Sequence, residues 1–175
     1  MDNTKIKEFV PGIYDHMFKA ILTDPNLKDY LVYLISEITS LDYDYVYQNI
    51  VINNSELRVK NKNQKRYKTD ILINIENNRV NIEANRVFSE GLVRKNNKYQ
   101  HSLASEEEVG KVYSSGFIYQ INFNGYNIFQ KEHNIIDKVM LTNVKTGEIE
   151  EEMFQRYHVN LAEIKKKYYN KEKLS

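Results

Sequence analysis

Two neighbouring segments of the chain carry three side chains that could do chemistry together. Tyr67–Asn74 contains Asp70, and Arg79–Arg86 contains Glu83 and Asn85. Carboxylate oxygens are the donors that hard divalent cations such as Mg²⁺ prefer. Two carboxylates close in space, with an amide beside them, therefore indicate a candidate metal site of the kind that hydrolyses phosphate esters.

The two segments are typical of a β-hairpin, and the register of that hairpin decides whether the acids meet. We take Asn77-Asn78 as a two-residue loop, because this composition tolerates positive φ. Asp70 then pairs with Asn85, and Leu72 pairs with Glu83. Since side chains alternate along a strand, Asp70 shares a face with Glu83 at a diagonal distance of roughly 7–8 Å. The alternative is a solvated hairpin face of ordinary polar residues.

Positive charge gathers around this hairpin, although the whole chain has a net charge of only +1. Residues 56–98 hold eleven Lys and Arg against five Asp and Glu, whereas residues 1–55 hold four against eight. Cations beside paired carboxylates suit a site that cuts phosphodiesters, because the cations hold the backbone and the acids hold the metal. A solvated polar loop over Lys60–Lys68 is the alternative.

Length and composition set the broad class of protein. The 175 residues fit one domain spanning 1–175, and the absence of cysteine excludes disulfides and thiolate sites. The first eight residues contain no apolar run, and no stretch approaches the roughly 20 apolar residues of a membrane span. We therefore expect a cytoplasmic protein with no membrane partner.

Helical and strand patterns follow one another in an order typical of an α/β fold with a mixed central sheet flanked by helices. Aromatic and apolar residues alternate most clearly over Ser115–Tyr126, which predicts a strand. The other strands predicted outside the hairpin are Tyr45–Ile52, Val139–Val144, Glu148–Met153 and Tyr157–Leu161. The predicted helices are Tyr14–Leu22, Leu27–Ile38, Phe88–Leu103 and Ala162–Tyr169.

Five segments, taken in chain order, resemble the PD-(D/E)xK nuclease superfamily. Within it, the likeness is to the Rpn group, the recombination-promoting nucleases that are also described as transposases. The likeness runs from about residue 10 to residue 166 and includes both hairpin strands. The segments are Tyr14–Leu22, Thr69–Ile73, Asn81–Asn85, the stretch from Arg94 to Phe123, and His158–Lys165.

This resemblance implies a restriction-endonuclease-like core and a metal-dependent DNA endonuclease, linked to recombination, mobile elements or phage defence. It implies that Asp70, Glu83 and the backbone carbonyl of Ala84 hold Mg²⁺ or Mn²⁺. Asp15 would supply a further acid, and Asn85 would position the attacking water. The implied partners are double-stranded DNA and a second copy of the chain in a homodimer. The residues that would contact DNA are Lys19, Arg86, Arg94 and Lys95.

The sequence departs from the superfamily where Asn85 stands at the position of a catalytic Lys, which is commonly Gln in the Rpn group. An amide can hydrogen-bond, whereas a Lys would also stabilise developing negative charge. A second hypothesis therefore stays open. The chain would keep the PD-(D/E)xK fold and act as a catalytically degenerate module that binds nucleic acid or protein.

Overall fold

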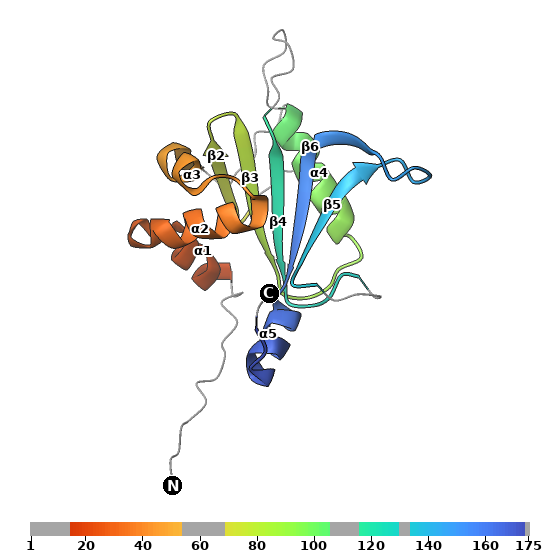
Figure 1. Cartoon of the computed structure of the whole chain (residues 1–175). Coiled ribbons are helices and arrows are strands. Elements are labelled where there is room, and N and C mark those ends of the chain that lie inside the picture. Colours follow the sequence, from red (N-terminus) through yellow and green to blue (C-terminus); the bar gives the residue numbers. More distant parts are fainter. Residues whose placement is uncertain (1–14, 54–68, 106–115, 130–133, 174–175) are drawn as a thin grey trace, which may run out of the picture.

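The computed structural model describes residues 15–53, 69–105, 116–129 and 134–173. Within these ranges a six-stranded sheet runs in the order β1-β2-β3-β4-β6-β5, with helices on both faces (Figure 1). None of the helices in these ranges has the length and apolar character needed to cross a bilayer. The predicted α/β class with a mixed, helix-flanked sheet is confirmed, and a single domain over residues 1–175 stays a prediction.

Helices precede the sheet, interrupt it once and close it. The strands are β1 Ile50–Asn53, β2 Ile71–Ile75, β3 Asn78–Asn85, β4 Ile118–Asn124, β5 Ile136–Thr142 and β6 Ile149–Asn160. The helices are α1 Asp15–Thr23, α2 Lys28–Thr39, α3 Tyr43–Asn49, α4 Leu92–Ser105 and α5 Leu161–Asn170, with a 3₁₀ turn over Pro25–Leu27.

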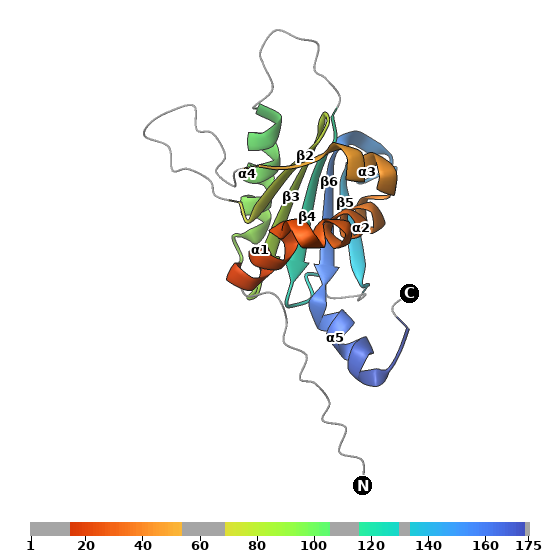
Figure 2. The same cartoon turned by 90° about the vertical axis from the view of Figure 1, so that its left-hand side faces the viewer.

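Parallel and antiparallel pairs coexist in the sheet. β3 pairs with β4 and β4 with β6 in parallel, while β1–β2, β2–β3 and β5–β6 are antiparallel. A parallel connection needs a crossover, and α4 supplies it between β3 and β4. Figures 1 and 2 together show α4 on the face of the sheet opposite α2 and α3.

The larger core fills the space between the sheet and the first helices. Alternate residues of each strand point to one face, so β2, β3 and β4 bury their β-branched and aromatic residues against α1 and α2. Phe18 of α1 meets Phe123 of β4 edge-on, with ring centroids 5.4 Å apart. Fully buried members include Val32, Ile35, Ile73, Ile75, Val80, Ile82 and Ile121. A smaller core of Leu72, Tyr99, Leu103 and Ile118 lies under α4.

The hairpin register differs from the prediction by two residues. The loop is Glu76-Asn77, with Glu76 at φ 52°, so that Ile75 pairs with Asn78 and Leu72 pairs with Asn81. Asn78 belongs to the ladder because its side-chain amide holds two neighbours. It donates to the Tyr45 hydroxyl at 3.2 Å and accepts from the amide of Phe117 at 2.9 Å. A shift of two leaves every side chain on its predicted face.

The predicted strand over Tyr45–Ile52 is wrong for most of its length. Residues up to Asn49 form α3, and only Ile50–Asn53 is extended as β1. Asp42 caps the helix by accepting the amide of Tyr45 at 2.8 Å, which favours helix over strand at this point.

The C-terminal half follows the predicted pattern with one simplification. The hairpin around Lys145-Thr146-Gly147 joins β5 to β6, and Gly147 adopts φ 75° in the turn. The two predicted strands Glu148–Met153 and Tyr157–Leu161 are parts of the single long strand β6, and α5 matches the predicted terminal helix.

Candidate active site

The face of the sheet beneath α4 is polar and buried. On β3 it presents Asn81, Glu83 and Asn85, which are at most 8% exposed. The parallel register places three further amides beside them on β4, and all three are fully buried. The solvated hairpin face considered from sequence is therefore wrong. The β4 residues are Gln120, Asn122 and Asn124.

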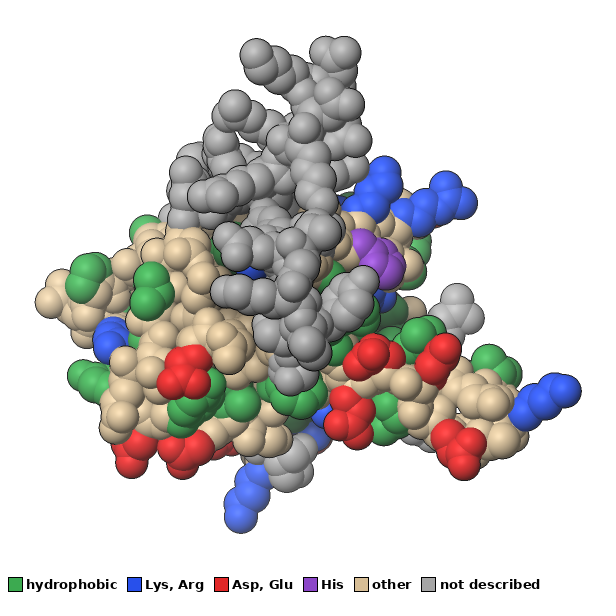
Figure 3. Space-filling model, turned by 90° about the horizontal axis from the view of Figure 1, so that it is seen from above, with side chains coloured by type: hydrophobic (Ala, Val, Ile, Leu, Met, Phe, Trp, Pro, Cys, Tyr) green, Lys and Arg blue, Asp and Glu red, His purple; other side chains and the backbone are tan. Residues whose placement is uncertain are grey.

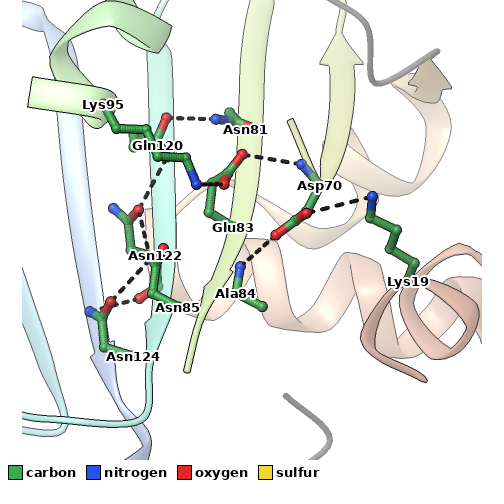
Figure 4. A network of polar contacts seen from close by, with 10 residues as sticks. All are labelled: Lys19, Asp70, Asn81, Glu83, Ala84, Asn85, Lys95, Gln120, Asn122 and Asn124. Carbon is green, nitrogen blue, oxygen red and sulfur yellow. Dashed lines mark hydrogen bonds and ion pairs between the residues drawn. The ribbon is translucent and has the colours of Figure 1, made fainter. Parts of the chain in front are cut away.

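Hydrogen bonds between neighbouring side chains link the amides of this face, although the Oδ1 of Asn81 is buried without a partner among the described residues (Figure 4). Asn81 donates to Gln120 at 2.8 Å, and Gln120 donates to Asn122 at 3.2 Å. A buried amide group left without a hydrogen bond costs free energy, so the bonds between these neighbours offset part of the cost of burying the array. These amides form a buried, hydrogen-bonded polar layer of the sheet beneath α4.

Asp70 and Glu83 lie side by side where β2 meets β3. Continuing the ladder one residue past the Ile71–Ile82 pair brings Asp70 opposite Glu83. The Asp70 amide donates to Glu83 Oε1 at 3.1 Å, and the Ala84 amide donates to Asp70 Oδ2 at 2.9 Å. The predicted pairing of Asp70 with Asn85 is wrong. The predicted proximity of the two acids is confirmed, since they lie opposite each other and not diagonally, and their joint binding of a metal ion stays a prediction.

Each of these carboxylates also holds one lysine. Lys95 of α4 reaches Glu83 Oε2 at 2.6 Å, and Lys19 of α1 lies 3.5 Å from Asp70 Oδ1 (Figure 4). The two acids and two lysines form a cluster without net charge. Helices from opposite faces of the sheet thus meet the same pair of acids.

Burial sets the protonation behaviour of Glu83, which is 1% exposed. Desolvation raises the pKa of its carboxyl, the Lys95 ammonium works against that rise, and the charge of Asp70 adds to it. Asp70 is the more open of the two acids, with 20% of its side chain exposed.

Asn85 belongs to a line of amides that ends at a histidine. It donates to Asn124 Oδ1 at 3.2 Å, and the Asn124 amide lies 3.2 Å from Nδ1 of His158 on β6. His158 is 4% exposed, and burial together with nearby Arg156 lowers the pKa of its imidazole to about 4. A neutral imidazole can accept the Asn124 hydrogen bond.

The oxygen donors suit a hard divalent cation in kind. Proteins hold Mg²⁺ through one or two carboxylates, and the ion keeps several of its waters. Asp70 and Glu83 can provide these carboxylates. The Ala84 amide donates to Asp70 Oδ2, which brings the Ala84 backbone to the acid pair, and the use of its carbonyl as a metal ligand stays a prediction. No third acid or histidine joins these two among the residues that the structure describes. Asp15 begins α1, but its side chain lies outside the described residues.

The predicted DNA-contacting residues divide into two groups. Lys19 and Lys95 join the acids, whereas Arg94 is exposed on α4 and Arg86 is exposed just after β3. Figure 3 shows that on the described part of the face seen from above, Lys and Arg side chains project separately from the periphery. Asp and Glu side chains lie over the lower half of the same view.

The sequence analysis did not identify the buried amides of β4 or the contact between Asn124 and His158. A signal was present, because Gln120, Asn122 and Asn124 alternate with the aromatic and apolar residues that predicted the strand. Three amides at every second position of a buried strand indicate a polar partner face.

Comparison of the chain with protein-family models, with curated proteins and with solved structures finds no match. The resemblance to the Rpn group and the restriction-endonuclease-like core therefore stay predictions.

Proposed function

We propose that the protein is a metal-dependent endonuclease that hydrolyses phosphodiester bonds of double-stranded DNA. One observation carries the proposal: Asp70 and Glu83 lie next to each other at the end of a buried hairpin, each with a lysine on its carboxylate. Paired acids and adjacent cations are the groups that phosphodiester hydrolysis needs.

In this proposal Asp70, Glu83 and the Ala84 carbonyl hold Mg²⁺ or Mn²⁺. When bound, the cation supplies Lewis acidity toward the scissile phosphate and lowers the pKa of a water. The chain's own residues do the rest. The Asp70 amide fixes the orientation of Glu83, and the Ala84 amide fixes the orientation of Asp70.

Lys95 takes the part that Asn85 cannot take. Its ammonium lies at the acid pair, whereas the Asn85 amide is turned toward Asn124 in the neighbouring strand. A positive charge at this position can hold a phosphate oxygen and stabilise charge that develops on it. Lys19 is placed to contact the phosphate backbone from the Asp70 side.

A degenerate binding module is the second candidate, and the ion pairs favour it. Two lysines already neutralise the two acids, which is how an acid pair is held when no metal is bound. In this alternative the chain keeps the fold and binds nucleic acid or protein without cutting.

A homodimer suits the proposed nuclease. Each chain has one site, so cutting both strands of a DNA duplex needs two chains.

Plasmid cleavage in Mg²⁺ or Mn²⁺ tests the proposal. The wild type is compared with Asp70→Asn, Glu83→Gln and the matched control Glu150→Gln, which changes an exposed acid of β6. We expect cleavage by the wild type and the control only. Calorimetric titration with Mn²⁺ reads the site independently of activity, with binding lost in both site variants. Mn²⁺ binding without cleavage would favour the degenerate module, and cleavage that survives both site substitutions would exclude this site.

A further inference from the structure

A cavity of about 230 Å³ lies between α4 and strands β5 and β6, away from the acid pair. Its polar wall comes from α4 and from Arg156 of β6, and its apolar wall comes from β5 and β6. Arg156 is on the buried polar face, two strands away from Asn81. Residues that line it include Asn97, Gln100, His101, Leu141, Phe154 and Arg156.

An irregular stretch of the β5–β6 ladder opens this cavity. Val139 pairs with Arg156, but the next pair is Leu141 with Glu151, so β5 advances two residues while β6 advances five. The extra residues of β6 have no partner on β5, although Phe154 still pairs with Ile118 of β4, and Phe154 lines the cavity at this point. Bulges of this kind redirect side chains and are frequent beside binding sites.

Arg156 brings a positive charge to the cavity that no carboxylate neutralises among the described residues. Its Nη2 donates to Oδ1 of Asn97 at 2.6 Å and to Oε1 of Gln100, both of which are neutral. Its Nε is buried and has no partner. A half-buried cation held only by amides is a poor structural element, because its desolvation is not repaid by an opposite charge.

The remaining wall suits an apolar group of modest size. Leu141 is 55% exposed at the rim, and Phe154 meets the His101 ring edge-on, with centroids 5.5 Å apart. Val139 and Met140 complete the apolar side. The cavity is smaller than most ligand pockets of 300–1,000 Å³, so it fits a small molecule rather than a polymer.

From these features we propose that the cavity binds a small organic oxyanion, a carboxylate or a phosphate monoester, attached to an aromatic or branched apolar group. Arg156 binds the oxyanion through the charge that the described residues leave unpaired, and guanidinium geometry matches both carboxylate and phosphate. Leu141 and Phe154 bind the apolar part. The site is independent of the proposed nuclease function.

Isothermal titration of the full chain with benzoate, phenyl phosphate, inorganic phosphate and benzyl alcohol tests this proposal. We expect benzoate or phenyl phosphate to bind at least about tenfold more tightly than the other two, because only they carry both parts. The comparison between benzoate and phenyl phosphate distinguishes the two oxyanions. Equal binding of benzyl alcohol, or no binding of any probe at millimolar concentration, overturns the proposal.

Variants locate the binding. Arg156→Gln should weaken binding of the tighter probe at least about tenfold. Arg94→Gln, which changes a solvent-exposed arginine of α4, should leave that affinity unchanged. Leu141→Glu changes an exposed residue at the rim of the cavity and places a negative charge there, so it tests the site even where Arg156→Gln fails to fold. It should abolish binding of both anions. Unchanged affinity in Leu141→Glu, or in folded Arg156→Gln, contradicts the proposed site.

Discussion

The backbone amide of Asp70 donates a hydrogen bond to the side-chain carboxylate of Glu83 at 3.1 Å, which joins the two acids directly. Two like charges held together in a buried hairpin repel each other, and a directional N–H donor offsets part of that cost. The arrangement fixes one acid relative to the other without a third side chain. It also makes the lysines on the outer oxygens the groups that determine the charge of the site.

Lys95→Met should separate cation binding from chemistry. Removing an ammonium 2.6 Å from Glu83 leaves the acid pair more negative, so Mn²⁺ should bind more tightly by calorimetry. Plasmid cleavage should fall by about 10²-fold, because the charge beside the phosphate is lost. Lys145→Met, which changes an exposed lysine of the β5–β6 turn, is the control. Weaker Mn²⁺ binding in Lys95→Met would contradict the assigned geometry.

The Lys95–Glu83 pair should show coupling in metal-free buffer. Lys95→Gln leaves a carboxylate that is 1% exposed without its ammonium, which should lower the free energy of unfolding by about 1–3 kcal/mol. Glu83→Gln removes that charge, so the double variant should be more stable than the sum of the single changes predicts. Urea unfolding of all four proteins measures the coupling, and strict additivity would show that the pair does not interact in solution.

His158 should make the protein lose stability in mild acid. Its pKa is about 4 in the folded chain, against about 6.5 when unfolded. Between these values the unfolded chain binds more protons, so stability is complete above about pH 6.5 and falls as pH decreases toward 4. The loss should reach about 3 kcal/mol. His158→Gln should remove this slope in urea unfolding at pH 4 to 7, and an identical slope in both proteins would place the titration elsewhere.

Gly116→Ala should destabilise the β2–β3 turn. A Cβ at Gly116 would collide with the carbonyl of Asn77, which is backbone and has no rotamer to change. We expect the free energy of unfolding to fall by about 1–3 kcal/mol. Gly91→Ala is the control, because its Cβ would meet only the Ser89 hydroxyl at 3.7 Å. Equal melting temperatures for the two variants would contradict the close approach.

The hairpin shows how much of the site the sequence contained. The loop position was wrong by one residue, which shifts the pairing register by two, and a shift of two keeps Asp70 and Glu83 on the same face of the ladder because strand side chains repeat with a period of two. Identity of the acids was therefore predictable, whereas their direct opposition was not. Asn78 decides the register through contacts with Tyr45 and Phe117, and neither contact is encoded locally.

Contacts between a helix and the sheet it packs on could not be predicted from the sequence. Lys95 was predicted to contact DNA, and only the packing of α4 over β3 shows that it reaches Glu83. The helix α3 was mistaken for a strand because Tyr and Val favour extended structure, and the Asp42 cap outweighs that preference. The strand preference of these residues was therefore outweighed by the hydrogen bond from the Tyr45 amide to Asp42 at the start of α3.

The amides shared by β3 and β4 also bear on how the chain finds its strand order. A parallel pair formed by apolar side chains alone can slide or exchange neighbours at little cost, but Asn81 bonds Gln120 and Asn85 bonds Asn124 only when the strands are aligned. Any other alignment buries amides that have no partner. These hydrogen bonds therefore discriminate against misfolded arrangements more than they add stability. Replacing them together by apolar residues should give a chain that collapses readily and populates several sheets instead of one.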